Sequence, residues 1–291
     1  MNTLDRRAFL KTALAGAGAI ALPWFPKSSL LAATERRFAA NDLVTLGKTG
    51  LVASRLALGS GTVGVDGESN QTRMGVDNFV RIIRHGFERG ITFWDTADQY
   101  GSHSCFREAL KYVPREKVVI LTKSNSSDAG RMKQDLERFR KELGVDYIDI
   151  FLLHCMAEGN WPEKMKPVMD VLGENREKKI VRACGVSCHR VSALQAAARD
   201  PWTDLILARL NHAGVAMDAA PDKVTPVLRE GNRNGKSIMA MKIVGVGQLR
   251  DQIDQSLNFV LAQGFVDALT IGFESTQELD QMIRKIAAVR V

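Results

Sequence analysis

Cysteine is scarce in this chain, and neither sign of charge is in large excess. Four cysteines among 291 residues are too few for a scaffold held together by disulfides. Cys155 and Cys188 follow adjacent predicted strands, so they either pair or remain buried thiols. The formal net charge is +7, of which residues 1–33 carry +3, and the remaining +4 is dispersed. This mild and scattered excess argues against nucleic acid as a partner.

Long apolar runs and a metal-ligand pattern are missing as well. The uncharged stretch 12–26 contains Pro23 and Pro26 and is shorter than the roughly 20 residues that span a bilayer. We therefore expect no stable membrane span in the mature chain. The predicted strand ends lack a convincing set of His and carboxylate ligands, which argues against a metal-dependent hydrolase.

The N-terminus has the layout of a secretory signal. Arg6 and Arg7 precede residues 9–11 (Phe-Leu-Lys) and the Ala- and Gly-rich stretch 12–26. This pattern resembles the twin-arginine (Tat) export signal. We therefore expect residues 1–33 to be a signal peptide, the twin-arginine export machinery to be a partner, and the mature protein to be periplasmic. A basic amphipathic arm, or an uncleaved signal that tethers the protein to a membrane, is the alternative.

From residue 42 onward, short apolar runs alternate with segments of helical periodicity. The predicted strands are 54–58, 91–94, 118–121, 147–153, 180–186, 205–210, 237–241 and 268–271. The predicted helices are 76–89, 131–143, 165–178, 223–234, 250–261 and 275–289. Continuous apolar runs are typical of parallel strands that are buried on both faces, and eight such strands close a barrel. The sequence thus predicts that residues 34–291 form a single α/β domain, a (β/α)8 TIM barrel with short loops at its C-terminal face. A doubly wound sheet is the weaker alternative.

Polar side chains follow three consecutive predicted strands. Asp95 comes after the second strand, with Tyr100 five residues later, while Lys123 and His154 end the third and fourth. Active sites of such barrels lie at these strand ends. The set suits proton donation to a carbonyl oxygen while hydride arrives at carbon. Tyr100 would be the general acid, with a pKa lowered from 10 by Lys123, and Asp95 would hold Lys123 while His154 orients the substrate.

Longer motifs around these residues resemble the aldo-keto reductases. Residues 90–101 (GITFWDTADQYG) are similar to the family's signature around its catalytic Asp and Tyr, and residues 118–123 and 146–154 to the segments that bear its Lys and His. Residues 46–54 resemble the family's opening hairpin and first strand, and residues 179–187 its fifth strand. The resemblance runs from about residue 44 to the end. It implies an oxidoreductase that reduces an aldehyde or ketone to an alcohol, or the reverse, with NADP(H) or NAD(H).

The resemblance also implies contacts to a cofactor that lies across the barrel mouth. Ser187 matches the serine that bonds the nicotinamide carboxamide, and Cys188 stands where an Asn is usual. Arg209 lies roughly at the position where the family has a Gln. The family's backbone holds the pyrophosphate after the seventh strand, where this chain has Gly245, Gly247 and Leu249.

The turn into the last helix departs from the family pattern. The family binds the 2′-phosphate of NADPH there with basic residues, whereas this chain has Glu274 and Glu278, which would repel a phosphate. Glu278 also completes a capping box with Ser275, whereas Glu274 has no such explanation. The family as a whole favours NADPH, but this turn favours NADH.

Two readings of function remain open. The intact set of four polar residues favours an enzyme that acts on a small carbonyl or alcohol. The altered cofactor contacts favour a non-catalytic exported barrel that serves as a binding or interaction module. The connection after the seventh predicted strand is only a few residues long, which predicts a shallow and open pocket.

Overall fold

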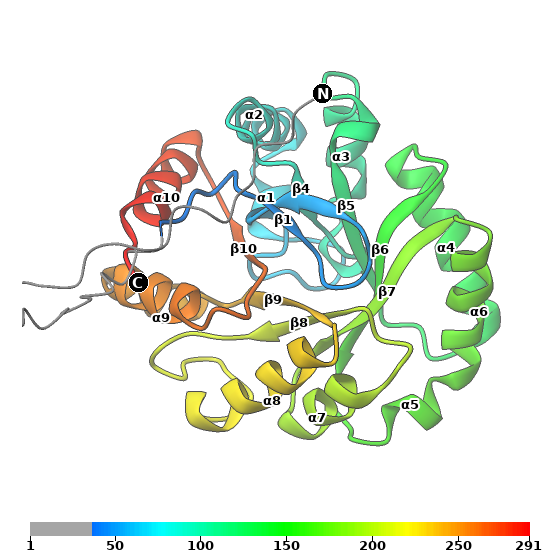
Figure 1. Ribbon diagram of the computed structural model, residues 1–291. Helices are drawn as coiled ribbons and strands as arrows, with labels where there is room; N and C mark the ends of the chain where they lie inside the picture. The colour runs from blue at the N-terminus through cyan, green and yellow to red at the C-terminus, as the bar shows by residue number, and fades with distance from the viewer. Residues whose placement is uncertain (1–36) are drawn as a thin grey trace, which may run out of the picture. The chain divides into compact units, whose positions relative to one another are not determined.

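Eight parallel strands close into a barrel with helices around its outside (Figure 1). The computed structural model describes residues 37–291, so the predicted signal peptide at residues 1–33 lies outside the described residues. The strands hydrogen-bond in the order β10-β3-β4-β5-β6-β7-β8-β9. They span β3 (Leu56–Gly59), β4 (Phe93–Asp95), β5 (Val119–Ser124), β6 (Ile148–Met156), β7 (Val181–Cys188), β8 (Leu205–Arg209), β9 (Ser237–Met241) and β10 (Ala268–Gly272). The predicted (β/α)8 barrel is confirmed.

The helices follow the strands as the alternating pattern predicts. They are α1 (Asn70–Arg73), α2 (Val76–Glu88), α3 (His103–Ala109), α4 (Ala129–Leu143), α5 (Trp161–Lys164), α6 (Lys166–Glu177), α7 (Val191–Arg199), α8 (Pro221–Arg233), α9 (Ile253–Ala262) and α10 (Thr276–Ala288). Short 3₁₀ turns add η1 (Asp98–Tyr100), η2 (Arg115–Lys117), η3 (Gly245–Gly247) and η4 (Arg250–Gln252). The apolar face of α10 packs against the barrel, because Leu279, Met282 and Ile286 recur at helical spacing and are buried.

An antiparallel hairpin precedes the barrel, formed by β1 (Leu43–Thr45) and β2 (Val52–Ser54). Its Leu46 and Leu51 belong to the inner apolar cluster of the barrel. The amide of Lys48 donates to the Gly235 carbonyl just before β9 begins. The hairpin therefore closes the N-terminal end of the barrel and leaves the opposite end free for a site. The predicted first strand, 54–58, begins two residues too early, because Ser54 ends the hairpin strand β2 and β3 begins at Leu56.

Side chains alternate along each barrel strand between two apolar layers. One layer fills the barrel interior and includes Phe93, Leu121 and Leu152. The other lies between strands and helices and includes Trp94 and Leu153. Because the period of a strand is two, a residue's position in this alternation decides whether it faces the lumen or the helices.

Candidate active site

Three of the predicted catalytic residues continue the inward-facing rows of their strands. Asp95 follows Phe93 on β4, Lys123 follows Leu121 on β5, and His154 follows Leu152 on β6. Their exposed fractions are 5%, 1% and 4%. They lie within the last residues of their strands, and β5 and β6 each extend three residues beyond the predicted strand ends.

Asp95 and Lys123 form a buried ion pair in the lumen. The Lys123 ammonium donates to Asp95 Oδ1 at 2.5 Å and to the Thr96 carbonyl at 2.7 Å. The Thr270 hydroxyl on β10 donates to Asp95 Oδ2 at 2.8 Å. The carboxylate therefore has a partner on each oxygen, as a buried charge requires. Thr270 was missed by sequence reasoning, although it also occupies an inward position near the end of its strand.

Tyr100 reaches the same point from the turn η1 after β4. Its hydroxyl lies 3.4 Å from His154 Nε2, and Lys123 Nζ lies 4.9 Å from the centroid of its ring. The structure thus brings together all four predicted residues, from β4, η1, β5 and β6. This arrangement can deliver a proton from the phenol to an oxygen that is held between Tyr100 and His154.

Glycines after β3 hold the Tyr100 ring in place. A Cβ atom at Gly61 or Gly64 would approach ring carbons of Tyr100 to 2.4 Å, so the backbone itself packs on the ring. Residues 59–64 (GSGTVG) have the G-x-G-x-x-G spacing of a dinucleotide-binding turn. In this fold the spacing instead provides close approach to a tyrosine, and the closed barrel excludes a Rossmann sheet.

Burial governs the ionisation of the site. It raises the pKa of Tyr100 above 10, with smaller increases from Asp95 and Cys155, and Lys123 only partly opposes this. Lys123 lowers the Tyr100 pKa as expected, but the expectation of a net pKa below 10 is corrected, because desolvation of the phenolate is the larger effect. Burial lowers the pKa of Lys123, but Asp95 and Tyr100 reverse this and leave it raised. Burial, helped by Lys123, holds the His154 pKa well below 6.5, so this imidazole is neutral at pH 7.

Ser187 and Cys188 occupy opposite sides of β7. The Ser187 hydroxyl accepts a hydrogen bond of 2.8 Å from the amide of Cys155, where the pairing of β6 and β7 shifts register. Cys155 has a left-handed φ of 60°, so Ser187 stabilises a bulge directly after His154. Cys188 is one residue out of phase and is fully buried in the layer against the helices. The expected cofactor contact at Cys188 is thus corrected, because its side chain does not face the lumen; its sulfur is free, as is that of Cys155.

Arg209 ends β8 in an inward position, but its guanidinium is already engaged. Nη1 lies 3.2 Å from Asp218 Oδ1, and Nη2 lies 2.6 Å from His189 Nδ1. Since a guanidinium can only donate, His189 Nδ1 accepts, and the ring proton sits on Nε2. Nε2 lies 3.6 Å from the Cys155 sulfur. Arg209 therefore anchors a polar chain beside His154.

A groove of about 640 Å³ runs from Asp95 and Tyr100 to the junction of β10 and α10. Asp95 and Tyr100 lie at one end, and Glu274, Glu278 and Lys285 at the other. Val63 and Val246 also line the groove, and they have left-handed φ angles of 51° and 56°. Such angles are rare for β-branched residues and mark strained backbone.

The connection after β9 forms part of the wall of this groove. It spans residues 242–252 and contains two 3₁₀ turns, so it is longer than the few residues that we expected. Gly247 lines the groove with a left-handed φ of 87°, while Gly245 packs against the buried Leu249. Arg250 also lines the groove and donates to the Gly247 carbonyl at 3.1 Å. Sequence reasoning missed Arg250, because the motif drew attention only to the glycines.

The far end of the groove is acidic at the positions the sequence indicated. Ser275 caps α10 by accepting from the Glu278 amide, and the Glu278 carboxylate accepts from the Glu274 amide at 2.8 Å. Glu274 accepts from Asn70 Nδ2 at 2.6 Å. Each acidic residue thus has a structural partner, and both still line the groove.

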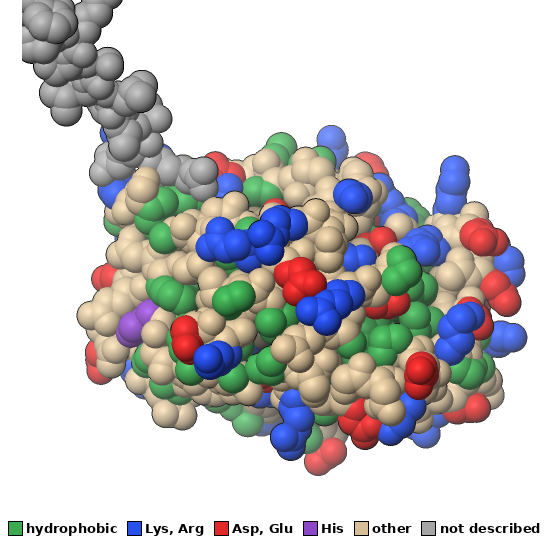
Figure 2. Space-filling model, turned by 60° about the horizontal axis from the view of Figure 1, so that its bottom comes forward, with side chains coloured by type: hydrophobic (Ala, Val, Ile, Leu, Met, Phe, Trp, Pro, Cys, Tyr) green, Lys and Arg blue, Asp and Glu red, His purple; other side chains and the backbone are tan. Residues whose placement is uncertain are grey.

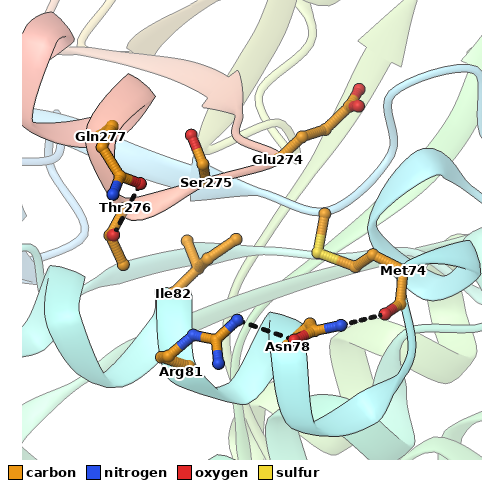
Figure 3. A pocket seen from close by; sticks show the side chains of 8 residues that line it. All are labelled: Met74, Asn78, Arg81, Ile82, Glu274, Ser275, Thr276 and Gln277. Carbon is orange, nitrogen blue, oxygen red and sulfur yellow. Dashed lines mark hydrogen bonds between the residues drawn. The ribbon is translucent and has the colours of Figure 1, made fainter.

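A second cavity of about 520 Å³ lies beside this end, between α2 and the start of α10 (Figure 3). Arg81 lines it and donates to the Asn78 side chain at 2.7 Å. In Figure 3 the Glu274 carboxylate points away from Arg81. The cavity holds one basic side chain, and that side chain already has a partner.

The groove fits an elongated cofactor with phosphates in its middle. Gly61, Gly247 and Gly272 line it, so a ligand can approach the backbone closely, and Arg250 lines it as well. Ser187 lies inward beside His154 and Cys155, at the end where a nicotinamide would sit. A dinucleotide in this groove would rest against residues of β3, β8, β9 and β10 and of the segments that follow β3, β9 and β10.

Other classes of site find no support in the described part of the chain. Between residues 37 and 291, no three His, Cys, Asp or Glu side chains are grouped so that they could hold a metal ion. No helix in that range is long and apolar enough to cross a membrane. On the face shown in Figure 2, acidic and basic side chains are interspersed.

Comparison with known proteins agrees with this geometry. The pattern of the aldo/keto reductase family matches residues 56–290. A Glycine max protein named "probable aldo-keto reductase 1" is 32% identical over 145 residues, 45% of this chain and 39% of that protein. Methylglyoxal reductase of Escherichia coli is 28% identical over 177 residues, 57% of this chain and 58% of that protein. This chain thus matches well under two thirds of the length of each. The holo structure of an aldo-keto reductase from Bacillus halodurans has a TM-score of 0.68 at 19% identity, with 85% of this chain and 91% of that chain covered, and shows the shared fold.

Proposed function

The chain belongs to the aldo/keto reductase family, and from this we propose that it is an NAD(P)H-dependent oxidoreductase that reduces a small aldehyde or ketone to an alcohol. The observation that supports this most directly is the convergence of Tyr100, Lys123, Asp95 and His154 beside a groove of about 640 Å³. A reduced nicotinamide bound there would supply hydride to the carbonyl carbon.

The chain's own residues then handle the oxygen and its proton. His154 is neutral and buried, and its Nε2 lies 3.4 Å from the Tyr100 hydroxyl, so the two groups can hold a carbonyl oxygen between them. Tyr100 donates its proton to that oxygen as negative charge develops. Lys123 stabilises the resulting phenolate, and Asp95 keeps Lys123 oriented and charged.

Replacement of Tyr100 by Phe tests this role. The ring and its packing on Gly61 and Gly64 are preserved, so fold and cofactor affinity should not change. The turnover number for aldehyde reduction should fall by roughly 10²–10⁴-fold, as expected for a lost general acid. Thermal unfolding and nicotinamide fluorescence titration provide the controls. A Tyr100→Phe variant with near-full reductase activity would show that another group donates the proton.

We further propose that NADH binds at least as well as NADPH. The carboxylates of Glu274 and Glu278 line the far end of the groove, and Arg81 is hydrogen-bonded to Asn78. Lys285 lines it too but is paired with Asp254 at 2.7 Å. A 2′-phosphate there would meet negative charge with little compensation.

Glu274→Gln is the sharper variant for testing this preference. It removes the charge but keeps an oxygen that can accept from Asn70. The dissociation constant for NADPH should fall relative to that for NADH, and the gain should shrink as salt is added. Tight, NADH-excluding binding of NADPH by the unmodified protein would contradict the proposal.

We also propose that the protein is exported through the twin-arginine route and acts in the periplasm. This rests on Arg6, Arg7 and the uncharged stretch that follows them.

A further inference from the structure

Five polar side chains lie at or just after the ends of β6 and of the three strands that follow it around the barrel. They come from the ends of β6, β7, β8 and β9 and from the segment after β8, and we call them the Lys242 cluster: Cys155, His189, Arg209, Asp218 and Lys242. Nothing in the proposed proton transfer requires this set. The cluster is therefore a candidate for binding another part of the substrate, next to the reacting carbonyl.

The cluster carries one positive charge without a partner. Lys123 is balanced by Asp95 at 2.5 Å, and Arg209 by Asp218 at 3.2 Å. Lys242 is the remaining cation: its backbone carbonyl accepts from Asn211 Nδ2, but its ammonium takes part in none of the ion pairs or side-chain hydrogen bonds of residues 37–291. The end of the groove nearest the carbonyl thus carries an excess of positive charge.

The neighbouring groups do not offset that charge at neutral pH. Burial, helped by Arg209, lowers the His189 pKa to about 4, so this ring is neutral. Burial raises the pKa of the Cys155 thiol and of the Tyr100 phenol, so neither is an anion. Burial raises the Asp218 pKa to about 6, so this carboxyl is still mostly ionised at pH 7, and it is already paired with Arg209.

Lys242 belongs to the catalytic end of the groove. It lines the groove together with Asp95 and Tyr100. The charges that act most strongly on its ammonium are those of Arg209, Lys123, Asp95 and Cys155, all near the catalytic residues. Burial lowers the Lys242 pKa, and a bound anion would reverse this by favouring the charged form. Its left-handed φ of 60° places it on strained backbone, as at Cys155 across the site.

We propose that Lys242, supported by Arg209, binds a carboxylate of the substrate, so that the preferred carbonyl compound is an anionic one such as a 2-oxo acid. This deepens the proposed reductase function and rests on it for the reaction. The charge balance is simple: one carboxylate neutralises the one unpaired ammonium. Binding it next to His154 would direct the adjacent carbonyl oxygen towards Tyr100.

Pyruvate and methyl pyruvate test the proposal, because they share a carbonyl and differ in charge. The unmodified enzyme should have the higher kcat/KM for pyruvate. Lys242→Met should lower kcat/KM for pyruvate by about 10- to 100-fold, as expected for one charge-assisted hydrogen bond. The value for methyl pyruvate should change less than threefold. Lys166→Met is the matched control, since Lys166 is exposed on α6 and bonded only to Asp170, and it should affect neither substrate.

Two further readouts separate the possible failures. Calorimetric titration with oxamate, an unreactive anion, with and without NADH, measures the site without turnover; Lys242→Met should weaken binding at least tenfold. Fluorescence titration should show an unchanged dissociation constant for NADH and NADPH. No binding of oxamate by the unmodified protein, an equal loss for acid and ester, or a loss confined to cofactor affinity would overturn the proposal. If oxamate binding depends on Lys242 but the unmodified protein reduces neither pyruvate nor methyl pyruvate with NADH or NADPH, the anion site stands and the proposed reductase function fails.

Discussion

At the scale of single residues, the ionisation of Tyr100 depends on two opposing influences. Its hydroxyl is buried beside a neutral His154, which disfavours phenolate, while Lys123 favours it. Burial prevails, so the pKa lies above its ordinary value of 10. The phenol is then protonated throughout the neutral and mildly alkaline range, and Lys123 acts chiefly when negative charge appears during the reaction.

The two reaction directions should therefore respond differently to pH. Reduction needs the protonated phenol, so its kcat should stay constant between pH 7 and about 9.5 and decline only above 10. Alcohol oxidation needs the phenolate, whose fraction grows about tenfold per pH unit below the pKa, so its kcat should climb across the same window. Steady-state profiles at saturating cofactor measure both. A decline of reduction centred below pH 9 would show that Lys123 outweighs burial.

At the scale of elements, the loop after β3 packs against the ring of Tyr100 and fixes its position. Gly61→Ala would place a methyl group 2.4 Å from the Tyr100 ring, which must move. A displacement of about 1 Å can cost on the order of 10²-fold in rate, so kcat for reduction should fall by roughly that amount. Gly173→Ala in α6 is the matched control, because its Cβ meets nothing within 4 Å. The control should keep full activity and gain about 0.5–1 kcal/mol in unfolding free energy. Equal activity in both variants would show that the loop adapts.

The elements also show what the sequence could and could not predict. Asp95, Lys123 and His154 were predictable because each extends the inward row of a strand whose apolar pattern is strong. Cys188 was misplaced by family analogy, although strict alternation from Ser187 turns it outward. The direction of the Tyr100 pKa could not be predicted, since it depends on burial by backbone from other segments. Lys242 was missed because its significance lies in having no partner, which only the assembled strand ends reveal.

At the scale of the whole molecule, the barrel and the proposed N-terminal export signal occupy separate parts of the sequence. The pattern of the aldo/keto reductase family matches residues 56–290, so the first 36 residues lie outside both the matched barrel and the described residues. An address that is read before or during export need not share contacts with the folded domain. The export proposal can therefore be tested by changes that leave the catalytic barrel untouched.

Conservative replacement of the arginine pair tests that proposal. Changing both Arg6 and Arg7 to Lys preserves the charge of the N-terminus but alters an address that is recognised by a receptor. The protein should then remain in the cytoplasm, with unchanged specific activity once purified, as cell fractionation and reductase assays would show. The chain provides its own control, because a second pair, Arg36 and Arg37, is not followed by an uncharged stretch as long as 12–26. Lys at both of those positions should leave export intact. Periplasmic delivery that survives the Arg6 and Arg7 replacements would mean that plain positive charge suffices, and that the twin-arginine route is not the one used.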